Sequence, residues 1–359
     1  MNDDYPYFKG IDDIENMSNE EYQKLSYDEK VIVWTTFYRK NPHRFVEHYL
    51  GIRLHFFQKI MIYLMFKFPY VILLCSRAVS KSFTTTITAC AICLLYPNSK
   101  VLVTAFTKQQ AALLITEKLQ KELLGLSPIL DEEIFNIKTG VNNTEVIFKN
   151  GSSFITSVSG EGARGLRSTV LVIDEFRLVK EDDLNAILIP TMIPRQAPYL
   201  MKQQYQHMSQ QPKRIMLSSA YYKAHWMWDA IRLAAKGSYN GTAALFSTDY
   251  FTTIKHGIKK REQMIEAKNA TDELNWLMEY CNICVGGAEN QYYSYDLIGN
   301  AQVLKRAFYP RTSDEYLSTT KKDKNGIRVK TGSWFGEIPK TKDELRVVSM
   351  DVAYSKDSR

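Results

Sequence analysis

The fold is decided by one segment, Tyr70-Val71-Ile72-Leu73-Leu74-Cys75-Ser76-Arg77-Ala78-Val79-Ser80-Lys81-Ser82-Phe83. Its apolar run predicts a buried strand, the polar residues predict a loop, and a helix-compatible stretch follows from Phe83 to about Leu95. Strand, loop and helix in this order form a phosphate cradle, because loop amides point inward and a helix N-terminus is partly positive. Lys81 would reach the β- and γ-phosphates, and Ser82 would bind Mg²⁺.

This loop departs from the usual pattern, Gly-x4-Gly-Lys-Ser/Thr. The chain has Cys75-x4-Ser80-Lys81-Ser82 and neither glycine. Residues other than glycine rarely adopt positive φ, so we expect a restricted loop that binds nucleotide weakly. For this segment alone, an ordinary polar loop between a strand and a helix is an equal alternative.

A second motif lies downstream, where the apolar residues 170–173 end at Asp174 and Glu175. A continuous apolar run is typical of a strand buried on both faces at the centre of a parallel sheet. Asp174 could hold Mg²⁺ through water, and Glu175 could polarise an attacking water. Acidic pairs also end ordinary strands, but the two motifs in this order favour nucleotide hydrolysis.

Composition sets the broad class. A chain of 359 residues with 45% hydrophobic and 24% charged residues is typical of a soluble globular protein with one large domain and appendages, or two domains. No apolar run reaches the roughly 20 residues that span a bilayer. The acidic start, Met1-Asn2-Asp3-Asp4, resembles neither a signal nor a transit peptide. Five cysteines indicate reduced thiols in a cytosolic setting.

Two cysteine pairs, Cys90-x2-Cys93 and Cys281-x2-Cys284, have the spacing of zinc ligands. The first lies in the apolar helix after the loop, and the second lies in an apolar segment without a nearby histidine. Core packing is therefore favoured over a zinc site.

Charge is unevenly distributed along the chain. Residues 1–30 carry nine acidic and three basic side chains, a net −6, whereas residues 195–270 carry twelve basic and four acidic ones, a net +8. A basic surplus interleaved with aromatic residues suits the surface of a polyanion such as nucleic acid, although a solvated basic face is the alternative.

Further elements extend the pattern around the two motifs. We expect a helix over 31–50, a strand over Lys100–Ala105 with a helix over 108–124, and a hairpin over 141–159 with Asn150-Gly151 as its two-residue turn. A strand between the phosphate loop and the acidic strand marks the additional-strand branch of P-loop ATPases. Gln58 could pair with both edges of adenine, although surface glutamines are common.

Three arginines are candidates for sensing the γ-phosphate. Arg164 and Arg167 lie in a glycine-rich loop before the acidic strand, and Arg77 lies inside the phosphate loop. Arg164 is our first choice for an arginine finger and Arg167 the second, although arginines there could merely solvate a turn.

Another apolar strand, 214–217, ends in Ser218-Ser219-Ala220. Its place after the other motifs suggests a coupling motif, which senses hydrolysis and transmits it to the part of the protein that holds the substrate. Serines after a core strand are also common turn formers.

Taken together, the series resembles the large terminase subunit of tailed double-stranded DNA phages over residues 45–359. The resemblance rests on Gln58, the variant Walker A loop with Arg77, the basic loop 164–167 before the Walker B pair, and Ser218-Ser219-Ala220. It implies an ATPase, with ATP and Mg²⁺, that drives double-stranded DNA into a procapsid. It also implies that Arg164 acts in trans on a neighbouring subunit of a homo-oligomeric ring.

The resemblance implies further context. Expected partners are the portal and the small terminase subunit, and the expected location is the cytoplasm of the infected bacterial host rather than the mature virion. Asp351 ends a new apolar strand that resembles the first strand of the RNase H-like terminase nuclease, although it could be an ordinary strand-end aspartate. Two-metal cleavage needs more carboxylates, so we expect this chain to hydrolyse ATP but not to cut DNA.

The predicted fold is α/β: a P-loop ATPase of the additional-strand, RecA-like type with a mostly parallel sheet, helices on both faces and a small lid. Its expected parts are an acidic helical lead-in (1–50), the ATPase core (51–220), a helical lid (221–310), a linker (311–343) and the start of a nuclease domain (344–359). Two alternatives stay open: a helicase-like or remodelling ATPase, and a nucleotide-dependent binding module with a degenerate loop.

The predicted site residues fall into four groups. Nucleotide-binding candidates are Gln58, Ser76, Arg77, Ala78, Val79, Ser80, Lys81, Ser82 and Phe83. Catalytic candidates are Glu175, Arg164 and Lys81, metal candidates are Ser82 and Asp174, and coupling candidates are Ser218, Ser219 and Ala220.

Overall fold

The computed structural model describes residues 17–140, 143–198, 211–286, 320–322, 324–326 and 328–330. The chain divides into two compact units, residues 1–290 and 291–359. In the second unit the described residues form one antiparallel pair of strands, β9 (Thr320–Lys322) and β10 (Arg328–Lys330). Asp351 lies outside the described residues, so its role stays a prediction.

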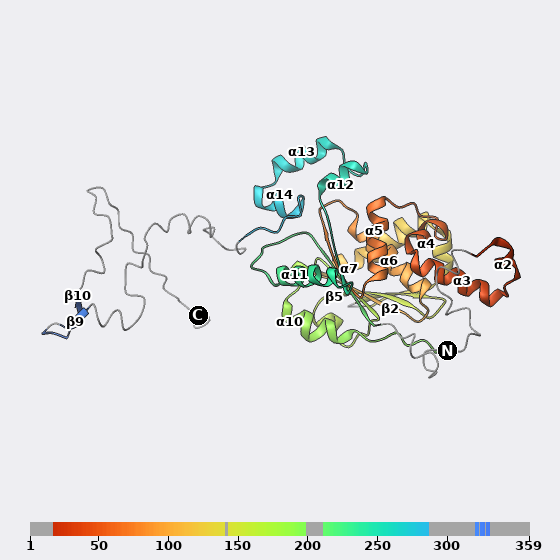
Figure 1. Cartoon of the computed structure of the whole chain (residues 1–359), viewed down its shortest axis with the longest axis horizontal. Helices are drawn as coiled ribbons and strands as arrows, with labels where there is room; N and C mark the ends of the chain where they lie inside the picture. Colours follow the sequence, from red (N-terminus) through yellow and green to blue (C-terminus); the bar gives the residue numbers. More distant parts are fainter. Residues whose placement is uncertain are drawn as a thin grey trace. The chain divides into compact units, whose positions relative to one another are not determined.

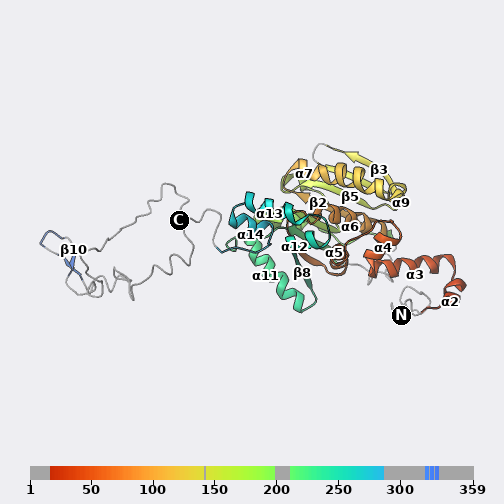
Figure 2. The same cartoon turned by 90° about the horizontal axis from the view of Figure 1, so that it is seen from above.

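An eight-stranded sheet organises the first unit, with the order β3-β4-β5-β2-β6-β7-β1-β8. Figure 2 shows it from β3 at one edge to β8 at the other. In this spatial order, every neighbouring pair from β5 through β2, β6, β7 and β1 to β8 is parallel. The pairs β3–β4 and β4–β5 are antiparallel. The strands are β1 (Tyr70–Cys75), β2 (Lys100–Ala105), β3 (Ile134–Thr139), β4 (Asn143–Phe148), β5 (Ser153–Val158), β6 (Val170–Asp174), β7 (Lys213–Ser218) and β8 (Ala243–Thr248).

The strand order confirms the additional-strand class of fold. In space, β7 lies between the phosphate-loop strand β1 and the acidic strand β6, whereas β2, the strand between them in sequence, lies beyond β6. The carboxyl ends of β1, β6 and β7 therefore meet at one edge of the sheet, as in doubly wound α/β folds.

Helices cover both faces of the sheet (Figure 1). The main α-helices are α2 (Asn19–Lys24), α3 (Tyr27–Lys40), α4 (Pro42–His48), α5 (Phe56–Lys67), α6 (Lys81–Leu95), α7 (Lys108–Leu113), α8 (Leu124–Leu126), α9 (Pro128–Glu133), α10 (Glu181–Asp183), α11 (Trp226–Tyr239), α12 (Tyr250–Lys255), α13 (Arg261–Ala270) and α14 (Glu273–Glu279). Short turns of 3-10 helix are η3 (Glu161–Ala163), η4 (Phe176–Leu178) and η6 (Ile189–Thr191), and wider π-helical segments are η2 (Leu114–Leu123) and η5 (Leu184–Leu188).

The alternation of side chains along β1 divides the core in two. Val71, Leu73 and Cys75 belong to a cluster with α5, α6 and η2, whereas Ile72 and Leu74 belong to a cluster with η5 and α11. Successive strand residues point to opposite faces, so a strand covered on both sides is apolar throughout. Cys90 and Cys93 are buried in α6, which confirms their assignment to the core.

Three expected elements differ in detail. The helix expected over 31–50 is two helices, because Pro42 begins α4 and cannot continue the hydrogen bonds of α3. The hairpin turn has three residues, 149–151: Phe148 N–H bonds to Ser152 O at 2.9 Å, and Gly151 has φ +80°. This loop length places the glycine at a left-handed bulge rather than in a two-residue turn.

The segment after residue 220, expected to be mostly helical, contains a strand of the central sheet. β8 pairs in parallel with β1, from Tyr70 with Ala243 to Cys75 with Thr248. Three helices, α12, α13 and α14, follow it. No helix in the described ranges is long and apolar enough to cross a membrane.

Candidate active site

The phosphate loop joins β1 to α6 as expected, with α6 beginning at Lys81. Ala78 (φ +66°) and Ser80 (φ +54°) both adopt the left-handed backbone although neither is glycine. Ser76 N–H bonds to Thr248 O at 3.2 Å, and Arg77 N–H bonds to Glu279 O at 2.8 Å, so neighbouring segments fix the start of the loop. The two residues hold this conformation at a cost of about 1–2 kcal/mol each, and the weak nucleotide binding expected from the missing glycines stays a prediction.

The first turn of α6 is open to an anion. Its N-cap, Ser80, makes no capping hydrogen bond through its side chain. The first amides of an α-helix have no acceptors within the helix, so they are available to a negatively charged group. Within the loop, Val79 is buried in the core. Phe83, in the first turn of α6, is partly buried and packs against the same core.

Lys81 and Glu175 meet at the carboxyl edge of the sheet. Lys81 Nζ lies 2.6 Å from Glu175 Oε1, and the two side chains are 14% and 23% exposed. Burial alone would lower the pKa of Lys81, but the adjacent Glu175 carboxylate raises it, so the ammonium stays charged. Glu175 follows β6 with φ +49°, another strained non-glycine position of the kind that clusters at functional sites.

Asp174 lies beside this pair. Burial raises the pKa of its carboxyl to about 6, with Lys81 opposing the rise. Its Oδ1 accepts a hydrogen bond from Glu175 N–H at 3.1 Å. Asp174, Glu175 and Ser82 line a cavity of about 400 Å³, whose other wall is formed by Ala105, Gln110, Leu113, Leu114, Glu117, Lys118 and Glu122.

The donor set around this cavity fits Mg²⁺. A hydroxyl at Ser82 and a carboxylate at Asp174 are hard oxygen ligands, and Mg²⁺ on nucleotides commonly uses one or two protein oxygens beside phosphates and water. Among the described residues, no cluster of three or more histidine, cysteine or acidic side chains suits a metal on its own. A metal here would therefore depend on the phosphates for its remaining ligands.

The residues at the end of β7 contact Glu175 and a second acidic residue, Glu279 in α14. Ser218 Oγ donates to Glu175 Oε2 at 3.2 Å, and Ser219 Oγ donates to Glu279 Oε2 at 3.1 Å. Ala220 N–H bonds to Asn282 Oδ1 at 2.8 Å. Ser219 and Ala220 thus connect the end of β7 to α14 and to the segment that follows it, whereas Ser218 contacts Glu175.

Sequence reasoning missed two residues of this site, Arg177 and Glu279. Arg177 Nη2 lies 2.5 Å from Glu279 Oε1, and its Nε lies 3.3 Å from Glu175 Oε2 without hydrogen-bond geometry. Arg77 Nε lies 3.1 Å from Glu279 Oε2. A basic residue two positions after Glu175 was a visible signal for Arg177, whereas nothing local marks Glu279.

Two arginine candidates, Arg164 and Arg167, have partners other than the acidic residues of the site. The side chain of Arg164 is 64% exposed and pairs with Glu161 at 2.8 Å, and Arg167 is exposed and donates to Leu166 O. Neither arginine has an ion pair with Glu175 or Asp174 in the described part of the chain.

Gln58 is buried (3% exposed) and its amide is already engaged. Its Oε1 accepts from His55 N–H at 2.9 Å, and its Nε2 donates to Thr84 Oγ1 at 3.4 Å. This places Gln58 at the third position of a capping box that begins α5. To bind adenine it would have to exchange these partners, so that role stays a prediction.

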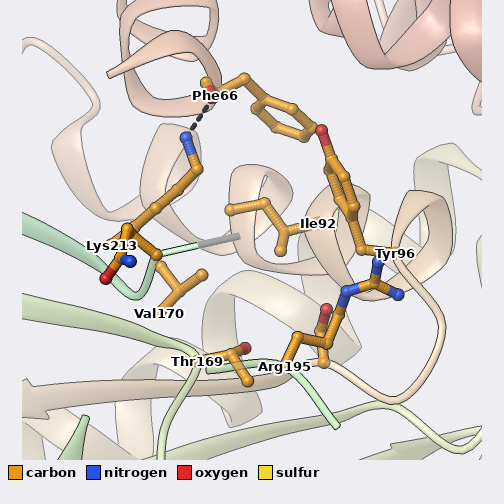
Figure 3. A pocket seen from close by; sticks show the side chains of 9 residues that line it. Phe66, Ile92, Tyr96, Thr169, Val170, Arg195 and Lys213 are labelled. Carbon is orange, nitrogen blue, oxygen red and sulfur yellow. Dashed lines mark hydrogen bonds between the residues drawn. The ribbon is translucent and has the colours of Figure 1, made fainter. Parts of the chain in front are cut away.

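A small cavity of about 20 Å³ lies at the amino ends of the parallel strands, opposite the phosphate loop (Figure 3). It has room for one water molecule but not for a nucleotide. Lys213 begins β7 there, and its ammonium donates to the backbone carbonyls of Phe66 and Phe68. Burial lowers the pKa of Lys213 to about 8.

The strand order and phosphate loop define a P-loop fold of the additional-strand class. Solved structures similar to this fold include large terminases of phages and one isolated terminase ATPase domain. The ATPase domain of the Thermus phage P74-26 large terminase has a TM-score of 0.50 and 15% identity, over 68% of this chain and 99% of that domain. The HK97 bacteriophage large terminase has a TM-score of 0.50 and 17% identity, over 68% of this chain and 55% of that one.

At such identities the similarity establishes the fold. The chain covers about half of the HK97 protein but nearly all of the isolated P74-26 domain. No protein-family model matches the chain. No curated protein matches it in sequence.

Proposed function

We propose that this chain is the ATP-hydrolysing motor domain of a phage large terminase subunit, which drives double-stranded DNA into a procapsid. The observation that carries the proposal is the 2.6 Å contact between Lys81 of the phosphate loop and Glu175 after the acidic strand, beside a cavity that Glu175, Asp174 and Ser82 line. The shared fold with terminase ATPase domains supports it.

In the proposed mechanism, Lys81 and the first amides of α6 bind the phosphates of ATP. Lys81 then leaves Glu175 for phosphate oxygens, which frees a carboxylate oxygen to orient water for attack on the γ-phosphate. Ser82 and Asp174 would hold Mg²⁺, which when bound supplies positive charge to the phosphates. The pKa of Asp174, about 6, leaves its carboxylate largely ionised at neutral pH and able to bind metal.

Arg164 is proposed to act on the ATP of a neighbouring subunit. Its side chain is 64% exposed and pairs with Glu161, which is 75% exposed, so this ion pair costs little to break. A ring of copies would bring such an arginine to the next subunit's γ-phosphate. The portal and the small subunit are the partners proposed for that assembly.

DNA contact is proposed for basic residues in and beside α12 and α13, where four exposed basic side chains outnumber the exposed Glu262 and Glu266. Lys255, Lys260, Arg261 and Lys268 are all exposed there. Phosphate contacts carry no base information, so binding should be independent of sequence and should weaken steeply with salt.

The test is ATP turnover with and without double-stranded DNA, in wild type and Glu175→Gln. The general-base role predicts a loss of about 10²–10⁴-fold in kcat. Glu47→Gln is the matched control, because Glu47 is also partly buried and pairs with Lys59 at 2.8 Å on an element outside the site. Turnover that survives Glu175→Gln would refute the assigned role.

The same assay separates the alternatives. A binding module would bind ATP analogues without turnover in wild type. A helicase would separate a forked duplex in an ATP-dependent manner, which a packaging motor is not expected to do.

A further inference from the structure

The carboxylate of Glu175 is held at both oxygens by different groups. Oε1 contacts Lys81 Nζ at 2.6 Å, whereas Oε2 accepts from Ser218 Oγ at 3.2 Å and lies 3.3 Å from Arg177 Nε. Of the three groups, only Lys81 belongs to the phosphate loop. Ser218 and Arg177 lie outside that loop, so Lys81 can move to a nucleotide without breaking the two contacts of Oε2.

Arg177 joins two carboxylates that are far apart in sequence. Its Nε faces Glu175, and its Nη2 lies 2.5 Å from Glu279 Oε1. The Arg177 side chain is 15% exposed and lies over the ring of Tyr221 at 5.5 Å. The guanidinium thus pairs with both acids: it contacts Glu279 closely through Nη2, and it faces Glu175 as a nearby positive charge, because Nε has no hydrogen-bond geometry to Oε2.

Glu279, the last residue of α14, accepts several contacts on the side of Arg177 away from Glu175. Its side chain is 10% exposed and accepts from Arg177, Arg77 and Ser219. Burial alone would raise the pKa of Glu279, but the Arg177 and Arg77 guanidiniums lower it, so a charged carboxylate is stable there. Its backbone carbonyl also accepts from Arg77 N–H at 2.8 Å.

We infer that Arg177 is a positioning residue for Glu175, and that Glu279 fixes Arg177 and links α14 to the reaction. With Lys81 on a phosphate, Oε1 is free to accept a proton from water, while Oε2 keeps its hydrogen bond from Ser218 and the adjacent positive charge of Arg177. A displacement of α14 would move Glu279 and, through it, Arg177, and would thereby change the position of the Glu175 carboxylate. This inference rests on the proposed ATPase function and adds a control point to it.

The experiment compares Arg177→Gln, Glu279→Gln and the double variant with wild type. Removing one partner leaves a buried charge unpaired and could unfold the protein, whereas the double variant removes both charges and keeps the site neutral. We expect kcat to fall about 10–100-fold in the double variant, as for a misplaced catalytic group, with KM and the affinity for ADP within about threefold of wild type.

Further readouts separate positioning from a general structural role. If Glu279 acts through Arg177, the two losses in kcat should not add in the double variant. Arg39→Gln and Glu47→Gln are matched controls, since both side chains are partly buried and paired on α3 and α4. We expect wild-type kcat from both.

The outcomes are distinct. A folded double variant with wild-type kcat overturns the inference and leaves the ATPase proposal intact. Equal losses in kcat and ADP affinity also overturn it, because they indicate collapse of the site. Absence of turnover in wild type, with ADP still bound, overturns the proposed function itself and the inference with it.

Discussion

A largely buried lysine lies at each end of the parallel strands of the central sheet, and the two lysines differ in their partners and in the direction of their pKa shifts. At the carboxyl edge, Lys81 lies against Glu175 and its pKa is raised. At the amino edge, Lys213 donates to two backbone carbonyls, and burial lowers its pKa to about 8 (Figure 3). In the proposed function a phosphate displaces the carboxylate from Lys81, whereas the two backbone carbonyls on Lys213 belong to the fixed framework of the fold.

The sharpest test of this difference replaces each lysine by methionine. Lys81→Met should lower ATP turnover by about 10²–10³-fold, because a charged donor to the transferred phosphate is lost. Lys213→Met should leave turnover within about twofold, since Lys213 lies at the far edge of the sheet. Steady-state ATPase assays decide the point, and equal losses would mean that the two edges do not differ in function.

Asp174 extends the comparison to stability. Its folded pKa, about 6, lies above its ordinary value, so its contribution to stability is present at low pH and is lost as pH rises through 6. At neutral pH the buried charge is therefore a cost. Without metal or nucleotide, Asp174→Asn should raise stability by up to about 3 kcal/mol while turnover is lost. Thermal unfolding measures this, and a lower melting temperature would contradict it.

Lys213 should show the reverse pH dependence. Its folded pKa, about 8, lies below its ordinary value, so the folded state binds fewer protons between about pH 8 and 10.5. Stability from this group should therefore rise with pH across that window, by at most about 1.4 kcal/mol per pH unit. Urea unfolding of wild type and Lys213→Met should show the difference, and identical pH profiles would argue against a buried ammonium.

The smallest expected effect concerns the strained loop. Ala78→Gly should stabilise by up to about 1 kcal/mol, because φ +66° is strained for alanine, although the unfolded chain gains entropy. Ala89, buried inside α6, is the matched control: Ala89→Gly should destabilise by about 1 kcal/mol or more. If both changes have the same sign in urea unfolding, backbone strain at Ala78 is not significant.

The central strands could be predicted because each is buried on both faces and has a continuous apolar run. The edge strands β3 and β8 were not predicted, because Asn136 and Lys138 interrupt the apolar residues of β3, and the apolar run of β8 is short and half alanine. The positions of Lys81 and Glu175 followed from two local motifs. The Arg177–Glu279 contact did not, because it depends on tertiary packing between segments about a hundred residues apart.

The position of β8 has a practical consequence for anyone shortening this protein. A fragment that ends at residue 220 would lose the outer neighbour of β1 and expose a long apolar strand edge to aggregation. It would also lose the Thr248 carbonyl that accepts from Ser76 and the Asn282 amide that accepts from Ala220. The smallest soluble piece that retains an intact phosphate loop should therefore extend beyond residue 282.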